Sequence, residues 1–140
     1  GLVGKVDKIN AKDIRSLISK DIIPVISPIG LDKQSQCLNI NADLVAGKVA
    51  ESLRAEKLIL LTDVNGIKDD EGNLLSKISS AKAKKVLKNG IVKGGMVPKL
   101  IAALEATQKG VSQAHIIDGR VPHAVMLEIL TKEGVGTLIS

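Results

Sequence analysis

The chain is 140 residues long, 44% hydrophobic and 25% charged, and it carries a formal net charge of +5 at pH 7. This length and composition predict one globular domain over residues 1–140. The positive charge does not indicate a nucleic-acid partner, because the sequence has no Phe, Tyr or Trp on which bases could stack. The lysines are scattered, and their one local cluster, at positions 82, 84, 85 and 88, is typical of a solvated helix face.

The cysteine and histidine content excludes two kinds of site. The one cysteine, Cys37, cannot form an internal disulfide, and no Cys/His cluster has the spacing of a zinc site.

No apolar run approaches the roughly 20 residues that cross a bilayer, and the opening residues lack the apolar core of a signal peptide. We therefore expect no membrane partner and a location in the cytoplasm or a plastid stroma.

Short aliphatic runs alternate with amphipathic stretches along the chain. In chain order we expect a strand at residues 2–9, a helix at 13–20, a strand at 22–26, a helix at 42–53, a strand at 57–61, helices at 80–88 and 97–109, a strand at 114–118, a helix at 122–130 and a strand at 136–139. This alternation predicts an α/β fold, a three-layer sandwich in which helices cover both faces of a mostly parallel sheet.

The helix expected at residues 42–53 has the clearest pattern. Its apolar residues recur at helical spacing and should face the sheet, namely Ala42, Val45, Ala46, Val49 and Leu53. Asn41 and Asp43 suit a helix N-terminus. The helix at residues 122–130 should begin at Pro122, because the fixed φ of proline suits the first helical position.

Ligands of open α/β sheets bind at strand ends and helix N-termini, so we expect chemistry where the predicted elements meet. One such boundary is the TDVNG run, in which Asp63, Asn65 and Gly66 follow the strand at residues 57–61. These residues offer polar groups and a flexible turn at the edge of the sheet. Asn-Gly is also a common signal of a plain turn, and this run alone does not separate the two interpretations.

A second boundary is the KGGMVPK run at residues 93–99. Gly94 and Gly95 can expose backbone N–H groups at a helix start, and Lys99 lies about one turn into that helix. Glycines, a helix N-terminus and a lysine together favour phosphate binding. The spacing is neither a Walker A motif nor GxGxxG, so a glycine-initiated surface helix explains this run equally well.

The NINAD run at residues 39–43 is a third boundary. Asn39 and Asp43 lie four residues apart across a helix start, where a carboxylate could orient lysines around a transferred phosphate, although simple helix capping explains the same residues. His115 lies inside an apolar strand and His123 lies early in a helix, and neither has a second His or Cys nearby. Their positions alone indicate no metal-binding or acid–base role.

Taken together and in this order, the segments NINAD, LILLTDVNGI, GGMVPKLIAALEA and HIIDGRVPHAVMLEILTKEGVGT resemble the second half of the N-acetylglutamate kinases, within the amino acid kinase family. The resemblance covers essentially the whole chain. It implies the nucleotide-binding C-terminal half of an α/β enzyme that phosphorylates the side-chain carboxylate of N-acetyl-L-glutamate in arginine biosynthesis, with ATP and Mg²⁺.

The family's first half, a lobe that supplies a glycine-rich loop and a lysine, has no counterpart here. We therefore expect the isolated chain to bind nucleotide weakly and to catalyse little or nothing.

The resemblance also assigns roles to single residues. It implies that Lys99 stabilises negative charge on the transferred phosphoryl group, that Asp43 orients the active-site lysines and that Asn39 holds the acetylglutamate. The residues it places at the nucleotide are Asp63, Val64, Asn65, Gly66, Ile67, Lys68, Ile91, Val92 and Lys93. It implies no metal ligand from the protein, since the nucleotide carries most of the Mg²⁺ coordination. A carboxylate acceptor is ionised at neutral pH and needs no general base, so positioning and positive charge can carry the reaction.

The C-terminal part resembles family members that arginine inhibits, and it implies an effector site containing His123, Glu128 and Gly136. The full-length enzyme of this kind is expected to be a homo-oligomer. Two other interpretations stay open. One is another amino acid kinase, such as an aspartokinase-like or uridylate kinase-like protein, and the other is a non-catalytic module that binds nucleotide or arginine.

Overall fold

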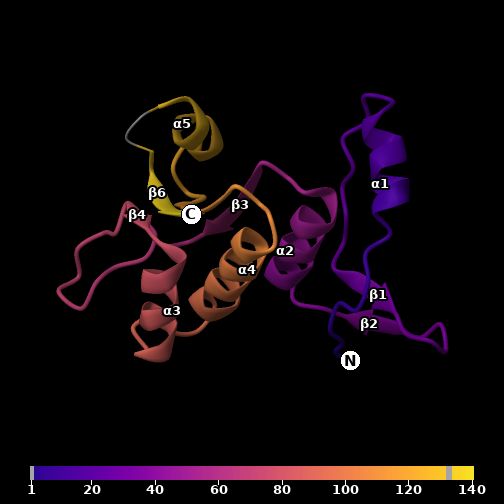
Figure 1. Ribbon diagram of the computed structural model, residues 1–140, viewed down its shortest axis with the longest axis horizontal. Coiled ribbons are helices and arrows are strands. Elements are labelled where there is room, and N and C mark those ends of the chain that lie inside the picture. Colours follow the sequence, from indigo (N-terminus) through magenta and orange to yellow (C-terminus); the bar gives the residue numbers. More distant parts are fainter. Residues whose placement is uncertain (1, 132–133) are drawn as a thin grey trace.

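The structure, a computed structural model, describes residues 2–131 and 134–140. Figure 1 shows the course of the chain. Its elements are, in order, α1 (Ala11–Ile18), β1 (Ile29–Leu31), β2 (Cys37–Asn39), α2 (Ala42–Leu53), β3 (Lys57–Thr62), β4 (Lys77–Ile78), α3 (Ser80–Lys88), α4 (Met96–Gln108), β5 (Gln113–Asp118), α5 (Ala124–Leu130) and β6 (Gly136–Ile139). No described helix has the length and apolar character that a membrane span requires.

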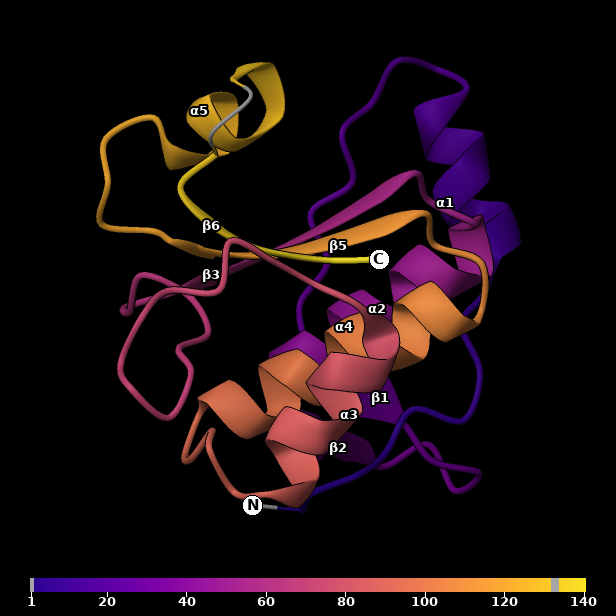
Figure 2. The same ribbon diagram turned by 60° about the vertical axis from the view of Figure 1, so that its left-hand side comes forward.

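Four strands form the main sheet in the order β3-β5-β6-β4. β3 pairs with β5 and β4 pairs with β6 in parallel, whereas β5 and β6 are antiparallel. The predicted α/β fold with a mostly parallel sheet is therefore confirmed. Figure 2 shows this sheet edge-on, with α2, α3 and α4 on one face and α5 on the other, which gives the expected three layers. β1 and β2 form a separate antiparallel pair.

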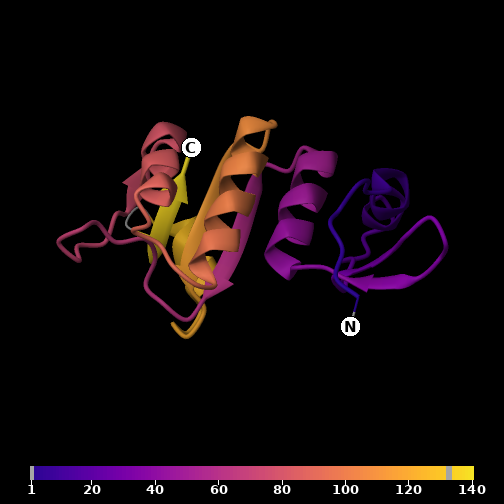
Figure 3. The same ribbon diagram turned by 90° about the horizontal axis from the view of Figure 1, so that it is seen from below.

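The core lies between the sheet and the helices α3 and α4. Alternate residues of the strands point into it, with Leu58 and Leu60 from β3 and Ile116 from β5 all buried. Figure 3 shows α3, α4 and α2 side by side along this face, with α1 and the β1-β2 pair beyond α2. The axes of α2 and α4 approach closely at Gly47, where an added Cβ would lie 3.2 Å from the Cβ of Ala102.

Two helices, α2 and α3, have the predicted bounds. The Asn41 side chain accepts a hydrogen bond from the Leu44 N–H at 3.2 Å and begins α2. The Ser79 hydroxyl accepts one from the Lys82 N–H at 3.3 Å and begins α3. α4 lies one residue earlier than predicted at each end, and α1 two residues earlier.

Two predicted strands in the N-terminal region are wrong. Residues 2–9 form one isolated parallel bridge, between Val3 and Asn39, because β2 offers a partner there and no described strand lies beside residues 5–9. Residues 22–26 form no strand with any described segment. The strands β1, β2 and β4, which were not predicted, have two or three residues each, too short for an alternating pattern to be recognised.

The start of the last helix and the orientation of α2 also differ from the prediction. α5 begins at Ala124, because His123 has a left-handed φ of 59°, which an α-helix excludes, and Pro122 lies in the turn before it. The α2 stripe meets the main sheet only in part. All five residues of the stripe line a groove of about 350 Å³, which Pro24, Ile26 and Pro28 line together with Lys57 and Leu58 of β3, because α2 lies at the margin of the sheet beside this edge strand.

Candidate functional site

The carboxyl ends of the parallel strands β3 and β5 lie together. Thr62 is the register partner of Asp118, and the Gly119 N–H donates a hydrogen bond to the Thr62 carbonyl at 2.8 Å. The two chains therefore leave the sheet at one place, where Asp63 follows β3 and Arg120 follows β5. In open α/β sheets this edge is where ligands bind.

A cavity of about 510 Å³ opens at this edge. The structure brings together there all nine residues that were predicted for the nucleotide, Asp63, Val64, Asn65, Gly66, Ile67, Lys68, Ile91, Val92 and Lys93, and adds Asp69, Met96 and Arg120. The nine come from two loops that α3 separates in sequence. The volume is in the range of small-molecule sites. Their shared location is a structural finding, whereas the binding of a nucleotide stays a prediction.

The loop at residues 63–68 is held in place by a buried hydrogen bond. The Ile67 N–H donates to the hydroxyl of Thr137, in β6, at 2.8 Å, and both residues are buried. Gly66 has a φ of 131°, and an added Cβ would lie 2.7 Å from the same hydroxyl oxygen. Only glycine fits this conformation and this space, so Gly66 and the hydrogen bond to Thr137 together define the shape of the loop. Sequence analysis did not predict a role for Thr137. The one feature that could have indicated it is its polar side chain within a short, otherwise apolar strand.

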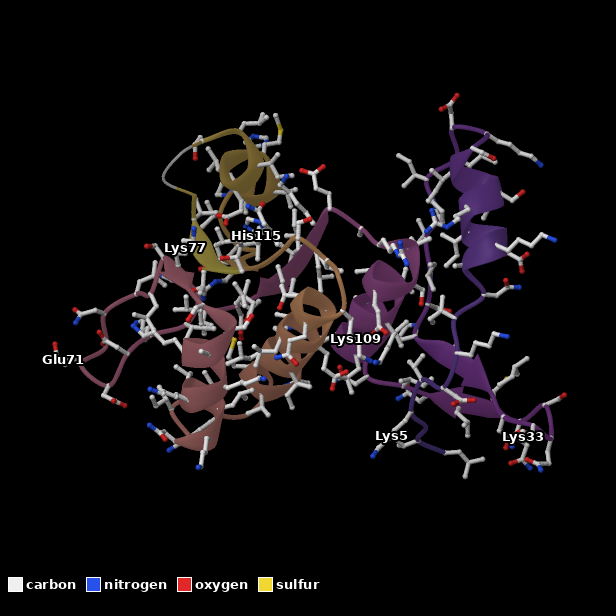
Figure 4. All side chains as sticks on the ribbon, in the orientation of Figure 1. Lys5, Lys33, Glu71, Lys77, Lys109 and His115 are labelled. Carbon is white, nitrogen blue, oxygen red and sulfur yellow. The ribbon has the colours of Figure 1, made fainter. Side chains whose placement is uncertain are left out.

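The loop continues into a turn built on Asp69. Its carboxylate accepts hydrogen bonds from the N–H groups of Asn73, at 2.8 Å, and Glu71, at 3.0 Å. The Asn73 hydrogen bond, which favours the ionised carboxylate, is the main cause of the lowered pKa of Asp69. Figure 4 shows Glu71 at the tip of this turn, away from the body of the protein.

Arg120 is held at the cavity by Asp118. The guanidinium Nε and Nη2 donate to the two carboxylate oxygens at 2.9 and 2.8 Å, and the Arg120 backbone N–H also donates to one of them at 3.0 Å. The side-chain hydrogen bonds of Arg120 lower the pKa of Asp118 to about 2. Asp118 is buried, whereas the Arg120 side chain is 65% exposed, so the pair presents a fixed cation to the cavity. Sequence analysis missed Arg120, although its place directly after a strand was a signal.

Lys99 and Asp43, predicted as catalytic, form an ion pair. The Lys99 Nζ lies 2.8 Å from one carboxylate oxygen of Asp43 and 3.0 Å from the other, and each side chain is 18% exposed. Asp43 is in the first turn of α2 and Lys99 in the first turn of α4, and the close approach of these helices brings the two side chains together. Met96, one turn before Lys99, lines the cavity, so the pair lies close to it.

The other predicted site residues lie near these elements. Asn39 is exposed at the end of β2. Its backbone forms hydrogen bonds with Leu2 and Gly4, and its side chain forms none with the described residues. Gly94 and Gly95 precede α4, and a Cβ added to either would meet nothing within 4 Å. The surroundings of these two glycines are therefore open, which leaves room for a phosphate near the start of α4.

A second, smaller cavity of about 300 Å³ lies between the sheet and α5. His115 Nδ1 lies 2.7 Å from Oε1 of Glu128, and the Val135 N–H donates to the other oxygen at 2.6 Å. Figure 4 shows His115 on the side of the sheet below α5. Glu128 and Gly136, both predicted for an effector site, line this cavity together with His115. His123 is exposed at the start of α5 and does not line it.

Comparison with known proteins places the chain in a family. The model of the amino acid kinase family matches residues 1–118. This chain belongs to the amino acid kinase family. Acetylglutamate kinases of Alcanivorax borkumensis and Hydrogenovibrio crunogenus are 58% and 55% identical to it over all 140 residues. The match covers 47% of each relative, so the chain spans about half the length of these amino acid kinases.

Solved structures agree with the amino acid kinase fold. N-acetylglutamate synthase from Neisseria gonorrhoeae, solved with coenzyme A and L-arginine, has a TM-score of 0.92 at 26% identity, over 100% of this chain and 32% of that one. Carbamate kinase from Giardia lamblia, bound to AMP-PNP, has a TM-score of 0.76 at 21% identity, over 96% of this chain and 45% of that one. The second likeness concerns the fold alone.

Proposed function

We propose that this chain supplies the nucleotide-binding half of an acetylglutamate kinase, which transfers the γ-phosphoryl group of ATP to the side-chain carboxylate of N-acetyl-L-glutamate. The main support is that the cavity at the β3 and β5 ends contains all nine residues predicted for the nucleotide. The names of relatives that are 51–58% identical to the chain point to the same reaction.

The residues around this cavity fit a nucleotide phosphate chain. Lys68, Lys93 and Arg120 bring three cations to its lining, and two loops offer backbone groups. Within the described residues no group of three or more His, Cys, Asp or Glu side chains could hold a metal ion. In the proposed site the phosphates would supply most of the ligands of Mg²⁺, which would neutralise charge on the transferred group.

The proposed chemistry moves no proton. An acceptor carboxylate oxygen forms a bond to the γ-phosphorus while the bond from that phosphorus to the ADP oxygen breaks. Lys99 is the cation that we assign to the developing negative charge, and Asp43, whose two carboxylate oxygens both accept hydrogen bonds from its ammonium group, positions it. Asn39 is the proposed contact to acetylglutamate.

A binding and turnover experiment tests this function. MgADP is titrated calorimetrically into the chain, and turnover is measured in the chain co-expressed with the part of the Alcanivorax relative that lies outside the match. We expect weak saturable binding to the chain alone and acetylglutamate-dependent ADP release from the co-expressed pair. Lys99→Ala should lower the turnover by about 10²–10³-fold, whereas Lys109→Ala, at the opposite end of α4, should leave it unchanged. Binding without any turnover from a stable pair would instead favour the non-catalytic module.

A second proposal concerns arginine as an effector, at the cavity between the sheet and α5. Its support is the buried Glu128 carboxylate, which could pair with a guanidinium, and the L-arginine present in the N-acetylglutamate synthase structure that shares this fold. Titration of arginine into the chain tests it, with Glu128→Gln expected to weaken binding at least tenfold. Comparison of His115→Ala with His123→Ala decides which histidine belongs to the site.

A further inference from the structure

Arg120 has a second hydrogen-bonding edge that the described residues leave unused. A guanidinium group carries five N–H donors in a planar fork. Asp118 occupies one edge of this fork, because its two carboxylate oxygens accept from Nε at 2.9 Å and from Nη2 at 2.8 Å. The edge formed by the parallel N–H groups of Nη1 and Nη2 donates to no described residue. Arg120 lines the cavity at the ends of β3 and β5 and its side chain is 65% exposed, so this edge is available to a ligand there.

The ion pair fixes the place of this edge. Asp118 is buried and does not itself line the cavity, so its carboxylate holds the guanidinium from behind. The Arg120 backbone N–H donates to the same carboxylate at 3.0 Å, and the Gly119 N–H between them donates to the Thr62 carbonyl at 2.8 Å. The guanidinium is therefore attached to the ends of two strands. Much of the side-chain order that ligand binding requires is present in advance.

The two lysines of this cavity differ from Arg120 in this respect. Lys68 and Lys93 are exposed, and their ammonium groups form no ion pair or hydrogen bond with a described residue. Each would lose rotamer freedom on binding a ligand. An ammonium group is also a point charge, whereas a guanidinium edge matches two oxygens of one phosphate group. Arg120 is therefore the cation of this cavity that is best suited to hold a phosphate in one orientation.

We propose that Arg120 binds a phosphate group of the nucleotide through its Nη1–Nη2 edge, and that Asp118 is the positioning residue that holds this edge in the cavity. The inference rests on the nucleotide site proposed above and adds a residue that the family resemblance did not include. Lys99, which we assign to the transferred group, does not line this cavity. Arg120 is therefore assigned to a phosphate that ADP retains. A contact of this kind is made before and during the reaction, so it lowers KM for ATP and leaves kcat unchanged.

Comparison of two ligands tests the phosphate contact. MgADP and adenosine are titrated into the co-expressed pair, by calorimetry and by NMR respectively. We expect Arg120→Ala to weaken MgADP binding by about 10–100-fold, the usual effect of losing hydrogen bonds to a charged group, and to leave adenosine binding unchanged. Arg120→Lys keeps the charge but not the edge and should recover only part of this loss. Lys84→Ala is the matched control, because it removes one positive charge from the exposed face of α3. It should bind both ligands normally.

Two results of these titrations would overturn the proposal. One is equal MgADP affinity in Arg120→Ala and the unsubstituted pair. The other is loss of MgADP and adenosine affinity by the same factor, because it would mean that Arg120 only maintains the shape of the loop. Steady-state kinetics give a further check, since Arg120→Ala should raise KM for ATP and a fall in kcat alone would contradict the assignment.

A double-mutant cycle tests the positioning role of Asp118. Asp118→Asn keeps the size of the side chain but replaces one acceptor oxygen with an NH₂ group, so it cannot accept both hydrogen bonds of the guanidinium. We expect this variant to weaken MgADP binding and to leave adenosine binding unchanged. Asp118→Asn combined with Arg120→Ala should bind MgADP no more weakly than Arg120→Ala alone, because Asp118 acts through Arg120. Additive losses would contradict the positioning role.

Inorganic pyrophosphate separates this inference from the kinase function. The chain has three arginines, Arg15, Arg54 and Arg120, so their guanidinium signals are readily assigned by NMR of the isolated chain with isotope-labelled arginine. We expect pyrophosphate to shift the Arg120 signals saturably and to leave the other two unchanged. No shift, or an equal shift of all three, would overturn the proposal. A selective shift without turnover from the co-expressed pair contradicts the proposed function alone, whereas turnover with an unchanged KM for ATP in Arg120→Ala contradicts the role of Arg120 alone.

Discussion

The ammonium group of Lys99 contacts both carboxylate oxygens of Asp43, at 2.8 and 3.0 Å, across the interface of α4 and α2. This contact makes the orientation of the lysine depend on the carboxylate. In the co-expressed pair, we expect Lys99→Ala to lower kcat by about 10²–10³-fold, the usual effect of removing one group that stabilises transition-state charge. Asp43→Asn should also lower kcat but leave the affinity of the chain for MgADP unchanged. A loss of MgADP affinity in Asp43→Asn would contradict a positioning role.

The interface that carries this pair should tolerate no added volume at Gly47. A Cβ there would lie 3.2 Å from both the Cβ and the carbonyl oxygen of Ala102. We expect Gly47→Ala to lower the free energy of unfolding by about 1–3 kcal/mol through overpacking. Gly95→Ala is the matched control, because its φ of −63° suits alanine and its surroundings are open. It should raise the free energy of unfolding by about 0.4–1 kcal/mol. Urea unfolding of the two variants measures both values.

Thr137 should control the shape of the predicted nucleotide loop. Thr137→Val removes the hydroxyl and leaves the buried Ile67 N–H without an acceptor, which costs about 1–3 kcal/mol of unfolding free energy. Thr137→Ser retains the hydroxyl and loses a methyl group, at a cost of about 1 kcal/mol. Calorimetry should show weaker MgADP binding for the valine variant and near-normal binding for the serine variant. Equal binding by both would mean that the loop does not need this hydrogen bond.

The parts of the fold that the sequence predicted correctly are those with local signals. α2 and α3 have capping residues, Asn41 and Ser79, at their starts, and their bounds are as predicted. β3 and β5 are aliphatic runs long enough to be recognised. The two incorrect strands, at residues 2–9 and 22–26, have strand-like sequences but lack the neighbours that a strand requires. Strand pairing is a property of distant segments, and no local pattern in these 140 residues reports it.

The candidate site also divides into residues that the sequence predicted and contacts that it did not. The nine residues at the cavity came from a family resemblance, and the structure brings them together. The contacts that shape the site escaped detection because they join residues far apart or of ordinary type. Ile67 and Thr137 are 70 residues apart in sequence, and His115 and Glu128 meet across a strand and a helix. The resemblance implied an effector site with His123, Glu128 and Gly136, and the residue that contacts Glu128 in the structure is His115.

The Asp118–Arg120 pair should make part of the stability of the protein depend on acid pH. The folded-state pKa of Asp118 is about 2, below its ordinary value of about 3.9. A carboxyl group whose folded pKa is depressed contributes stability that is complete above its unfolded pKa and is lost as the pH falls through its folded pKa. The difference in unfolding free energy between the protein and Arg120→Ala should therefore be constant from pH 7 to about 4 and shrink towards pH 2. Arg15→Ala is the control, because Arg15 donates to the Leu53 carbonyl at 2.8 Å, which does not titrate, and its difference should not follow this profile. Urea unfolding at several pH values measures this profile, and NMR of the Asp118 carboxyl group measures its pKa. An Asp118 pKa near 4 in the unsubstituted protein would show that the ion pair with Arg120 does not form in solution.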